Sequence, residues 1–331
     1  MKTKDVVGID VSKLFLDCHI HCTAHSGRFS NTREGVRELV AWAEENSKAG
    51  KAKLLFVFEH TGLYTRPLCN QLSTTGHVFH IVPGLEIKRS MGIVRGKHDK
   101  ADAQKIALYG YRTREEIQPY QMPSAILERL KSLMSLRKKL VSQRAGHLAR
   151  LGEQIQVLEG KADELLLEVQ ETLIKALAQQ IALLEKEINR LIEEDPELRK
   201  MQELLISIKG VGHVTARFLI VNTLGFTAFK TWRQFASYCG IAPFPHQSGT
   251  SIRGKTKVSN LANKEGRTLM TLCAFTAIQY NPEMKAFYER RLAMGKNEMS
   301  TINIIRNKIL ARAFAVVQRG TPYVDTMKYA A

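Results

Sequence analysis

Val6-Val7-Gly8-Ile9-Asp10 is the stretch that decides the fold of the first third of the chain. A short apolar run that ends in a carboxylate is typical of a buried β-strand with an acidic side chain at its end. The run Leu54-Leu55-Phe56-Val57-Phe58-Glu59 repeats this pattern and is followed by the breaker His60-Thr61-Gly62. Because a buried charge is costly unless it is paired or bound to a metal, Asp10 and Glu59 are candidate metal ligands.

Two more carboxylates, Asp99 and Asp102, lie three residues apart where a helical pattern begins. Residues at this spacing face the same side of a helix. Together with Asp10 and Glu59 they form a set of hard oxygen donors, which favours Mg²⁺ or Mn²⁺ over zinc. Simpler interpretations stay open, because Asp99 could be only a helix N-cap and Glu59 only a solvated strand end.

Lys13 and Lys97 stand close in sequence to these carboxylates. Both are candidates for contact with a backbone phosphate, although a solvated lysine is the commoner case.

The first 122 residues alternate strand and helix patterns. Strand patterns cover residues 5–11, 13–22, 27–30, 53–58 and 77–82, and helix patterns cover residues 32–46, 61–74 and 99–111. Strands first, then alternating helices and strands, predict a mixed sheet with helices packed on it. We therefore expect one α/β domain over residues 1–122.

A helical connector is predicted over residues 123–196. Apolar residues from Leu127 to Leu158 fit alternating three- and four-residue steps, and those from Ile174 to Leu191 follow a heptad without error. Gly160 is a predicted break between two helical arms, and Asp195-Pro196 ends the second arm. The periodicity fits a helical bundle inside one subunit as well as a coiled coil that pairs two subunits.

Residues 197–331 are predicted to form a third, mainly helical domain. Ile208-Lys209-Gly210-Val211-Gly212 lies between two helical patterns, which is the form of a helix-hairpin-helix element. Lys209, Gly210 and Gly212 are candidate contacts to nucleic acid, because glycines let backbone N–H groups approach a phosphate and a helix N-terminus favours an anion. A plain turn with glycine C-caps is the simpler alternative.

One irregular stretch is predicted inside this domain, from residue 241 to residue 263. Its richest segment is Gln247-Ser248-Gly249-Thr250-Ser251-Ile252-Arg253-Gly254-Lys255-Thr256-Lys257. The hydroxyls are candidate nucleophiles, and Arg253, Lys255 and Lys257 would neutralise a phosphate. From composition alone, a basic phosphate-binding loop without a covalent role is the better interpretation.

The charge of the chain points to a polyanionic partner, most simply nucleic acid. The 331 residues carry 49 Lys and Arg against 32 Asp and Glu, and residues 201–331 hold 18 basic and 6 acidic side chains, net +12. No apolar stretch is long enough to span a membrane, and no signal peptide is recognisable. Five scattered cysteines fit a reducing compartment with free thiols, so we expect a cytoplasmic protein.

Three N-terminal motifs and three C-terminal segments occur in one characteristic order. They are Gly8-Ile9-Asp10-Val11-Ser12-Lys13, Phe58-Glu59-His60-Thr61-Gly62, Asp99-Lys100-Ala101-Asp102-Ala103, and then residues 208–212, 235–243 and 248–254. In this order the chain resembles the DEDD insertion-sequence transposases, the group that includes the Piv-type invertases and the bridge-RNA-guided recombinases. Farther on, Ser259 and Arg267 match the family, and Arg267 is a further candidate contact to nucleic acid, whereas Asn260, Ala262 and Gly266 depart from the family.

The resemblance implies a RuvC-like (RNase H-like) N-terminal domain, a coiled-coil connector and a C-terminal transposase domain. It implies that Asp10, Glu59, Asp99 and Asp102 bind Mg²⁺, and that Ser248 is a nucleophile that forms a covalent phosphoserine with DNA. It also implies donor and target double-stranded DNA, a structured non-coding guide RNA, and a dimer or tetramer with composite active sites.

The leading functional hypothesis is therefore an RNA-guided DNA recombinase of an insertion sequence. A RuvC-like Holliday-junction resolvase, or another metal-dependent nuclease without a covalent intermediate, is the first alternative. A nucleic-acid-binding scaffold with a degenerate site is the second.

Overall fold

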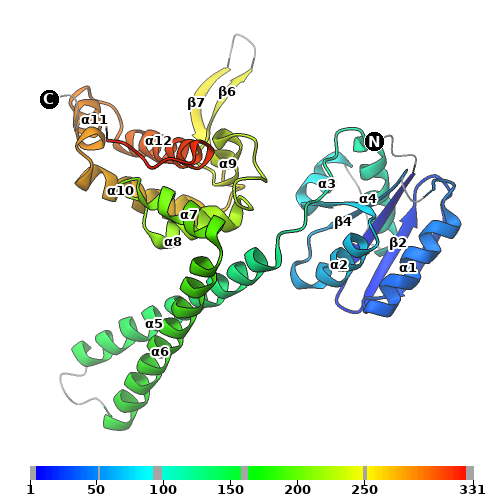
Figure 1. Cartoon of the computed structure of the whole chain (residues 1–331), viewed down its shortest axis with the longest axis horizontal. Coiled ribbons are helices and arrows are strands. Elements are labelled where there is room, and N and C mark those ends of the chain that lie inside the picture. Colours follow the sequence, from blue (N-terminus) through cyan, green and yellow to red (C-terminus); the bar gives the residue numbers. More distant parts are fainter. Residues whose placement is uncertain (1–4, 51–52, 92–98, 158–162, 249–251, 326–331) are drawn as a thin grey trace. The chain divides into compact units, whose positions relative to one another are not determined.

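The computed structural model describes residues 5–91, 99–157, 163–248 and 252–325, except for residues 51 and 52. It divides into two compact units, residues 1–122 and residues 123–331, which are described separately below (Figure 1). None of the helices that the structure describes is both long and apolar enough to cross a membrane.

The first unit is built on a five-stranded sheet with the strand order β3-β2-β1-β4-β5. Its strands are β1 (Asp5–Val11), β2 (Phe15–Ile20), β3 (Ser26–Ser30), β4 (Leu54–Glu59) and β5 (Val78–Val82). The first three strands are antiparallel, whereas β1, β4 and β5 run parallel to one another. The prediction of a mixed sheet is confirmed, with strand boundaries shifted by one or two residues.

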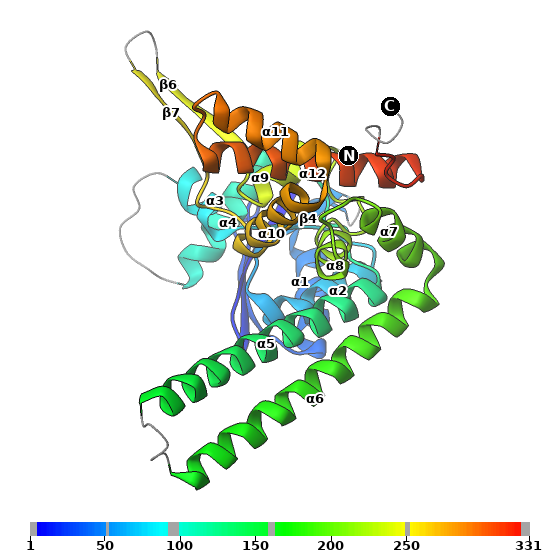
Figure 2. The same ribbon diagram turned by 90° about the vertical axis from the view of Figure 1, so that its left-hand side faces the viewer.

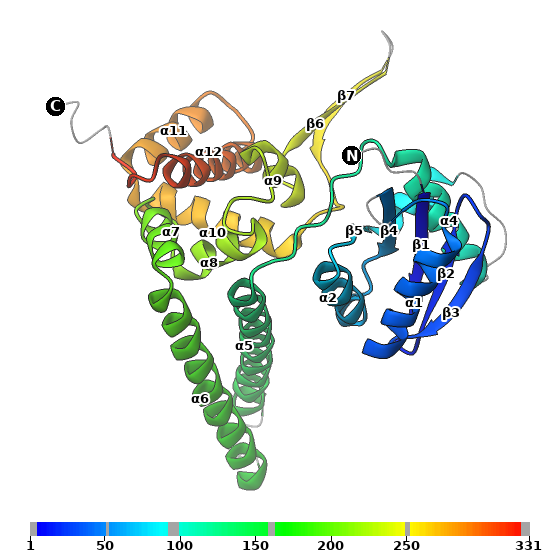
Figure 3. The same ribbon diagram turned by 45° about the vertical axis from the view of Figure 1, so that its right-hand side comes forward.

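Helices cover both faces of this sheet (Figure 3). On one face, α1 (Arg33–Asn46) and α2 (Arg66–Thr74) pack against alternate strand residues such as Ile9 and Phe56. On the other face, α3 (Gly84–Ser90) and α4 (Asp99–Thr113) cover the intervening residues, among them Val6 and Val57. Because β4 is buried on both faces, it is apolar at every position except its last.

Two details of the first unit differ from expectation. The helix predicted over residues 61–74 is divided into a 3₁₀ turn, η2 (Gly62–Thr65), and α2, because Gly62 is left-handed at φ +67° and Pro67 suits only a first helical turn. Helix α3 was not predicted, since its seven residues are too few to show a period.

Two long helices begin the second unit, α5 (Ala125–Val157) and α6 (Glu164–Glu194) (Figure 2). The heptad residues of α6 are buried or half-buried, with Ile188 fully enclosed. Ion pairs join the helices where Arg129 lies 2.5 Å from Glu187 and Arg137 lies 2.5 Å from Glu185. Helix α6 ends before Pro196, as predicted, whereas the predicted break at Gly160 lies outside the described residues.

The remaining helices pack around one apolar core that also takes in the near ends of α5 and α6. They are α7 (Pro196–Ile206), α8 (His213–Asn222), α9 (Trp232–Tyr238), α10 (Lys264–Tyr280), α11 (Pro282–Ala293) and α12 (Glu298–Arg319).

The stretch from residue 241 to residue 263 is not irregular, so that prediction is wrong. It contains a β-hairpin of β6 (Pro243–Ser248) and β7 (Ile252–Val258), which projects from the helical core (Figure 1). The prediction gave most weight to the glycines and hydroxyl residues in the middle of this stretch. It gave too little weight to the strand-forming residues on both sides of them, including Phe244, Ile252 and Val258.

Candidate active site

Asp10 is the last residue but one of β1, and Glu59 is the last residue of the neighbouring parallel strand β4. The register pairs Ile9 of β1 with Phe58 of β4, so the next residues along, Asp10 and Glu59, lie side by side. Since strand side chains alternate between faces, both carboxylates project from the face that α4 covers. Both are half-buried. The sheet therefore brings together two of the four predicted metal ligands.

Gly8 sets how closely α4 approaches this site. A Cβ atom at Gly8 would lie 2.2 Å from the backbone nitrogen of Ala107 and 2.4 Å from the carbonyl oxygen of Ala103. Farther along the helix, a Cβ atom at Gly110 would meet Val6 at 2.9 Å. The backbones of α4 and β1 are thus in direct contact, and only glycine allows this.

The same contacts give the direction of α4 along β1. Position 110 lies at Val6 and positions 103 and 107 lie at Gly8, so the helix runs from the Asp10 end of the strand towards its start. Asp99 lies about one helical turn before Ala103, which is about 6 Å along the helix axis. Asp10 lies two residues after Gly8, which is about 6.6 Å along the strand. The first turn of α4 therefore lies at the level of Asp10. The side chain of Asp99 is outside the described residues.

Asp102 has a partner within its own helix. Lys105 Nζ donates to Asp102 Oδ1 at 2.7 Å, and both side chains are partly exposed. In the described part of the chain, no three His, Cys, Asp or Glu side chains converge tightly enough to hold a metal ion. The described side chains of Asp10, Glu59 and Asp102 therefore do not form such a group.

Glu59 is packed against the start of α3. A Cβ atom at Gly84 would lie 1.9 Å from Glu59 Oε1, so the glycine makes room for this carboxylate. Helix α3 is tied to α4, because Tyr109 Oη donates to Glu86 Oε1 at 2.5 Å. Burial of the phenol, followed by its bond to Glu86, raises the pKa of Tyr109 to about 12.

Ser248 is the last residue of β6, where it pairs with Ile252 across the hairpin. Its side chain and those of Arg253 and Lys255 lie outside the described part of the structure, whereas Lys257 on β7 is exposed.

The other predicted nucleic-acid contacts are spread over both units. Lys13 is exposed in the turn after β1, and Lys97 lies outside the described residues. Lys209 is exposed in the turn between α7 and α8, where Gly210 is left-handed at φ +101° and lies against the carbonyl oxygen of Cys273. Gly212 caps α8 with open space around its α-carbon. Helices α7 and α8 thus lie on either side of this turn.

Comparison with known proteins decides the family. A family model described as "Transposase IS116/IS110/IS902 family" matches residues 202–289, and a DEDD transposase model of the IS110 type matches residues 7–159. The pilin gene-inverting protein of Moraxella bovis is 30% identical over 332 residues, which cover 97% of this chain and 98% of that protein. The chain belongs to the IS116/IS110/IS902 transposase family.

Other relatives agree with this assignment. The pilin gene-inverting protein of Moraxella lacunata is also 30% identical over 332 residues. An insertion element IS110 protein of Streptomyces coelicolor is 30% identical over 225 residues, 63% of this chain and 54% of that protein. The chain is thus a DNA recombinase of the transposase type, and the resemblance found in its motifs is confirmed. A superposition on RuvC of T. thermophilus, in complex with a Holliday junction substrate, covers 35% of this chain and 99% of that one at 12% identity. Its TM-score of 0.27 is too low to establish a shared fold.

A third carboxylate of this transposase lies beside the site and was not predicted from the sequence. Asp17 of β2 pairs directly with Asp10, and Arg28 of β3 pairs with Asp17, so all three lie in one row across the sheet. Asp17 is buried, and Arg28 donates to it through Nε and Nη2, both at 2.8 Å. The signal was an acidic residue inside the strand pattern, Phe15-Leu16-Asp17-Cys18.

Arg267 of the transposase has an internal contact. Its guanidinium donates to the carbonyl oxygen of Ser259, and a Cβ atom at Gly240 would lie 2.3 Å from Nη2. Gly240 is left-handed at φ +63°, and nearby Asn303 and Asn307 both donate to the carbonyl oxygen of Ile241. These bonds fasten both ends of the hairpin to α10 and α12.

Proposed function

We propose that this transposase breaks and rejoins DNA strands with the help of divalent metal ions bound by Asp10, Glu59, Asp99 and Asp102. The observation that carries the proposal is the adjacency of Asp10 and Glu59 at the ends of β1 and β4, with the first turn of α4 at the same level. We also propose that the sheet of the first unit is RuvC-like, with the carboxylates at the ends of its parallel strands.

The donor set fits Mg²⁺ or Mn²⁺, because these residues offer only carboxylate oxygens and described strands fix two of them. A bound ion would polarise the scissile phosphate and stabilise the charge that develops on it. The chain itself holds Asp10 by the β1 ladder and Glu59 by its packing against Gly84. Lys13, exposed in the turn after β1, is available to a neighbouring phosphate.

We further propose that Ser248 is the nucleophile. Its Oγ attacks the scissile phosphorus and loses its proton, while the bond from phosphorus to a deoxyribose oxygen breaks and that oxygen gains a proton. A deoxyribose hydroxyl of another strand then attacks the phosphoserine and restores Ser248. The phosphodiester energy is kept, so the strands are rejoined without a nucleotide cofactor. Ser248 ends β6 and pairs with Ile252, and the cations Arg253, Lys255 and Lys257 follow along the paired strand β7, which supports this role.

Two further parts of the proposal concern partners. Because the carboxylates and Ser248 belong to different compact units, we propose that subunits of a dimer or tetramer share composite sites, with α5 and α6 as a coiled-coil contact. We propose a structured non-coding RNA as the guide to donor and target DNA.

The segment from α7 to α8 is proposed as a helix-hairpin-helix element that contacts DNA through Lys209, Gly210 and Gly212. The net positive charge of residues 201–331 supports this nucleic-acid role and that of the guide RNA.

The test of the metal proposal is strand cleavage and exchange with purified protein, Mg²⁺ or Mn²⁺, and DNA that carries the ends of the element. Asp10→Asn and Asp102→Asn should each lower the rate by about a thousandfold or more, since a catalytic metal supplies several kcal/mol. Asp163→Asn, at the N-cap of α6, is the matched carboxylate control and should leave the rate unchanged. Full activity of both site variants would overturn the metal proposal, whereas DNA binding without any cleavage by the unaltered protein would favour the degenerate scaffold.

The test of the serine proposal is a protein–DNA adduct that survives denaturing electrophoresis. Ser248→Ala should abolish the adduct, whereas Thr256→Val, which removes an exposed hydroxyl from the same hairpin, should leave it in place. Metal-dependent cleavage without any adduct would favour the nuclease alternative. Sequencing of RNA that co-purifies with the protein tests the guide, and a random mixture of cellular RNA would contradict it.

A further inference from the structure

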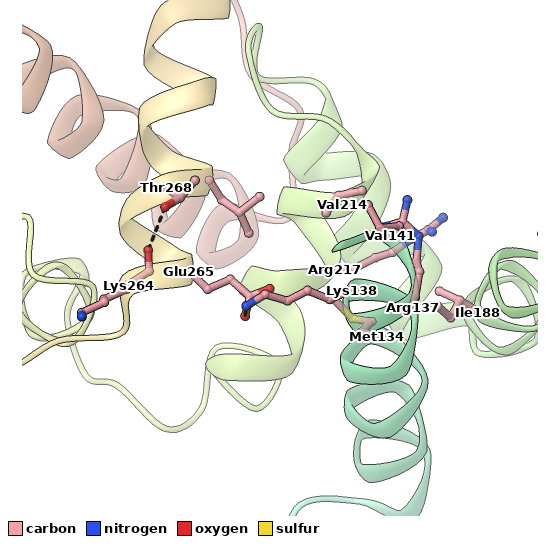
Figure 4. Close-up of a pocket in the computed structure, with 11 residues that line it drawn as sticks. Met134, Arg137, Lys138, Val141, Ile188, Val214, Arg217, Lys264, Glu265 and Thr268 are labelled. Atoms are coloured by element: carbon pink, nitrogen blue, oxygen red, sulfur yellow. Dashed lines mark hydrogen bonds and ion pairs between the residues drawn. The ribbon is translucent and has the colours of Figure 1, made fainter. Parts of the chain in front are cut away.

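A pocket of about 370 Å³ lies inside the second unit, where α5, α6, α8 and α10 meet (Figure 4). This volume is in the range of small-molecule sites, about 300–1,000 Å³. Much of its wall is apolar and comes from all four helices: Met134, Val141, Ile188, Val214 and Leu269. Val141 and Val214 are 39% and 41% exposed, so the apolar wall is open to a ligand.

The charge of the lining is strongly positive. Four cations, Arg137, Lys138, Arg217 and Lys264, face one carboxylate, Glu265. Lys138 and Glu265 neutralise each other at 2.7 Å in the middle of the pocket (Figure 4). The arginines at one end of the pocket remain as the main source of positive potential.

Arg217 is the most unusual of these groups, because it is buried and bonded only to neutral oxygens. It is 9% exposed, and it donates to Gln202 Oε1 at 2.8 Å and to Asn189 Oδ1. Within the described residues it forms no ion pair. Burial, and then the neighbouring charge of Arg137, lowers the pKa of Arg217, and the smaller opposing effects of Glu185 and Glu193 do not outweigh them.

Figure 4 shows the guanidinium groups of Arg137 and Arg217 side by side at this end of the pocket. Glu185 balances Arg137, to which it is bonded at 2.5 and 2.8 Å. A buried guanidinium that lacks a carboxylate partner is a strong site for an anion, since charge-assisted bonds strengthen where water is excluded. An inorganic anion would satisfy the arginines but would leave the apolar wall uncovered.

We propose that the pocket binds one unpaired nucleotide of a nucleic-acid strand, with its phosphate at Arg137 and Arg217 and its base on the apolar wall. A base that is flipped out of a strand can be held between apolar side chains, and an arginine offers a bidentate partner for its phosphate. The inference rests on the nucleic-acid chemistry proposed above, and it adds a site that holds a strand outside the reacting centre.

The experiment uses the full-length protein and single-stranded 12-mers that carry one 2-aminopurine, as DNA and as RNA. Val141→Trp fills the open side of the pocket from α5. Leu148→Trp is its matched control, because Leu148 lies two turns farther along α5, is 44% exposed and does not line the pocket. Val141→Trp should weaken binding by about tenfold, because the indole occupies the space of the base, while Leu148→Trp should not.

Arg217→Gln should weaken binding to a similar degree, and circular dichroism shows whether this buried variant is folded. The DNA and RNA probes distinguish a substrate strand from a guide strand, and preference for either supports the pocket. Equal affinity of the two tryptophan variants would overturn it, as would binding of free AMP without binding of either 12-mer. Failure of metal-dependent cleavage, with Val141→Trp still weakening binding, would instead count against the proposed function alone.

Discussion

The two units of this transposase present their candidate catalytic groups in opposite ways. Asp10 and Glu59 stand at the ends of strands that are buried on both faces, under a helix in backbone contact with β1. Ser248 stands at the end of a two-stranded hairpin whose described side chains, from Phe244 to Val258, are mostly exposed. A metal site needs several ligands in one fixed geometry, which a packed sheet provides. A nucleophile that must reach DNA needs access, which a projecting hairpin provides.

Gly8 offers the largest test of this contrast. Gly8→Ala inserts a methyl group between two backbones, so the free energy of unfolding of the first unit should fall by about 3 kcal/mol or more. Gly146→Ala is the control, because nothing lies within 4 Å of a Cβ atom there and alanine should stabilise α5 by up to about 1 kcal/mol. Urea unfolding measures both. A tolerated Gly8→Ala would mean that α4 does not depend on this contact.

Arg28→Ala tests whether Arg28 neutralises the buried charge of Asp17 beside Asp10. Arg28→Ala leaves Asp17 buried without its partner, and we expect a loss of about 1–3 kcal/mol, at the low end of a broken buried pair because Arg28 is 52% exposed. The uncovered charge beside Asp10 should also raise the affinity for Mn²⁺, measured by calorimetry. Arg37→Ala, at an exposed position of α1, is the control. The double variant Asp17→Asn with Arg28→Ala should recover most of both effects, and its failure to do so would separate Asp17 from the site.

The carboxylate row also shows what the sequence could and could not predict. Asp10 and Glu59 were predictable, because each ends an apolar run long enough to mark a buried strand. Asp17 was not, because its importance depends on the antiparallel register that sets it beside Asp10, and register is a tertiary property. The α6 heptad predicted a helix well, since an exact period survives in any packing. The hairpin was missed, because its turn-forming residues outweigh its short strands in the composition.

Gly84→Ala should change the geometry of the site with little effect on the stability of the first unit. In Gly84→Ala the new methyl group would displace the flexible end of Glu59, so the free energy of unfolding should change by less than about 1 kcal/mol. The affinity for Mn²⁺ should nevertheless fall by about tenfold, because one ligand is moved. Gly50→Ala, in open space, is the control. In a Glu59→Gln background, Gly84→Ala should have no further effect on the affinity for Mn²⁺. If Gly84→Ala lowers this affinity equally in that background, it does not act through Glu59.

Lys257→Ala has the smallest expected effect, and it tests whether the hairpin contacts DNA. Its side chain is exposed on β7, so Lys257→Ala should alter the free energy of unfolding by less than about 0.5 kcal/mol. If it contacts a DNA phosphate, the slope of log affinity against log salt concentration should become shallower by about 0.9. Lys175→Ala is the control, since Lys175 is equally solvated but lies beside Glu171 on the acidic helix α6. A slope unchanged in both variants would remove the phosphate role of β7. A slope that changes only for Lys257 would show that the hairpin, with almost no core of its own, still meets the DNA in a defined way.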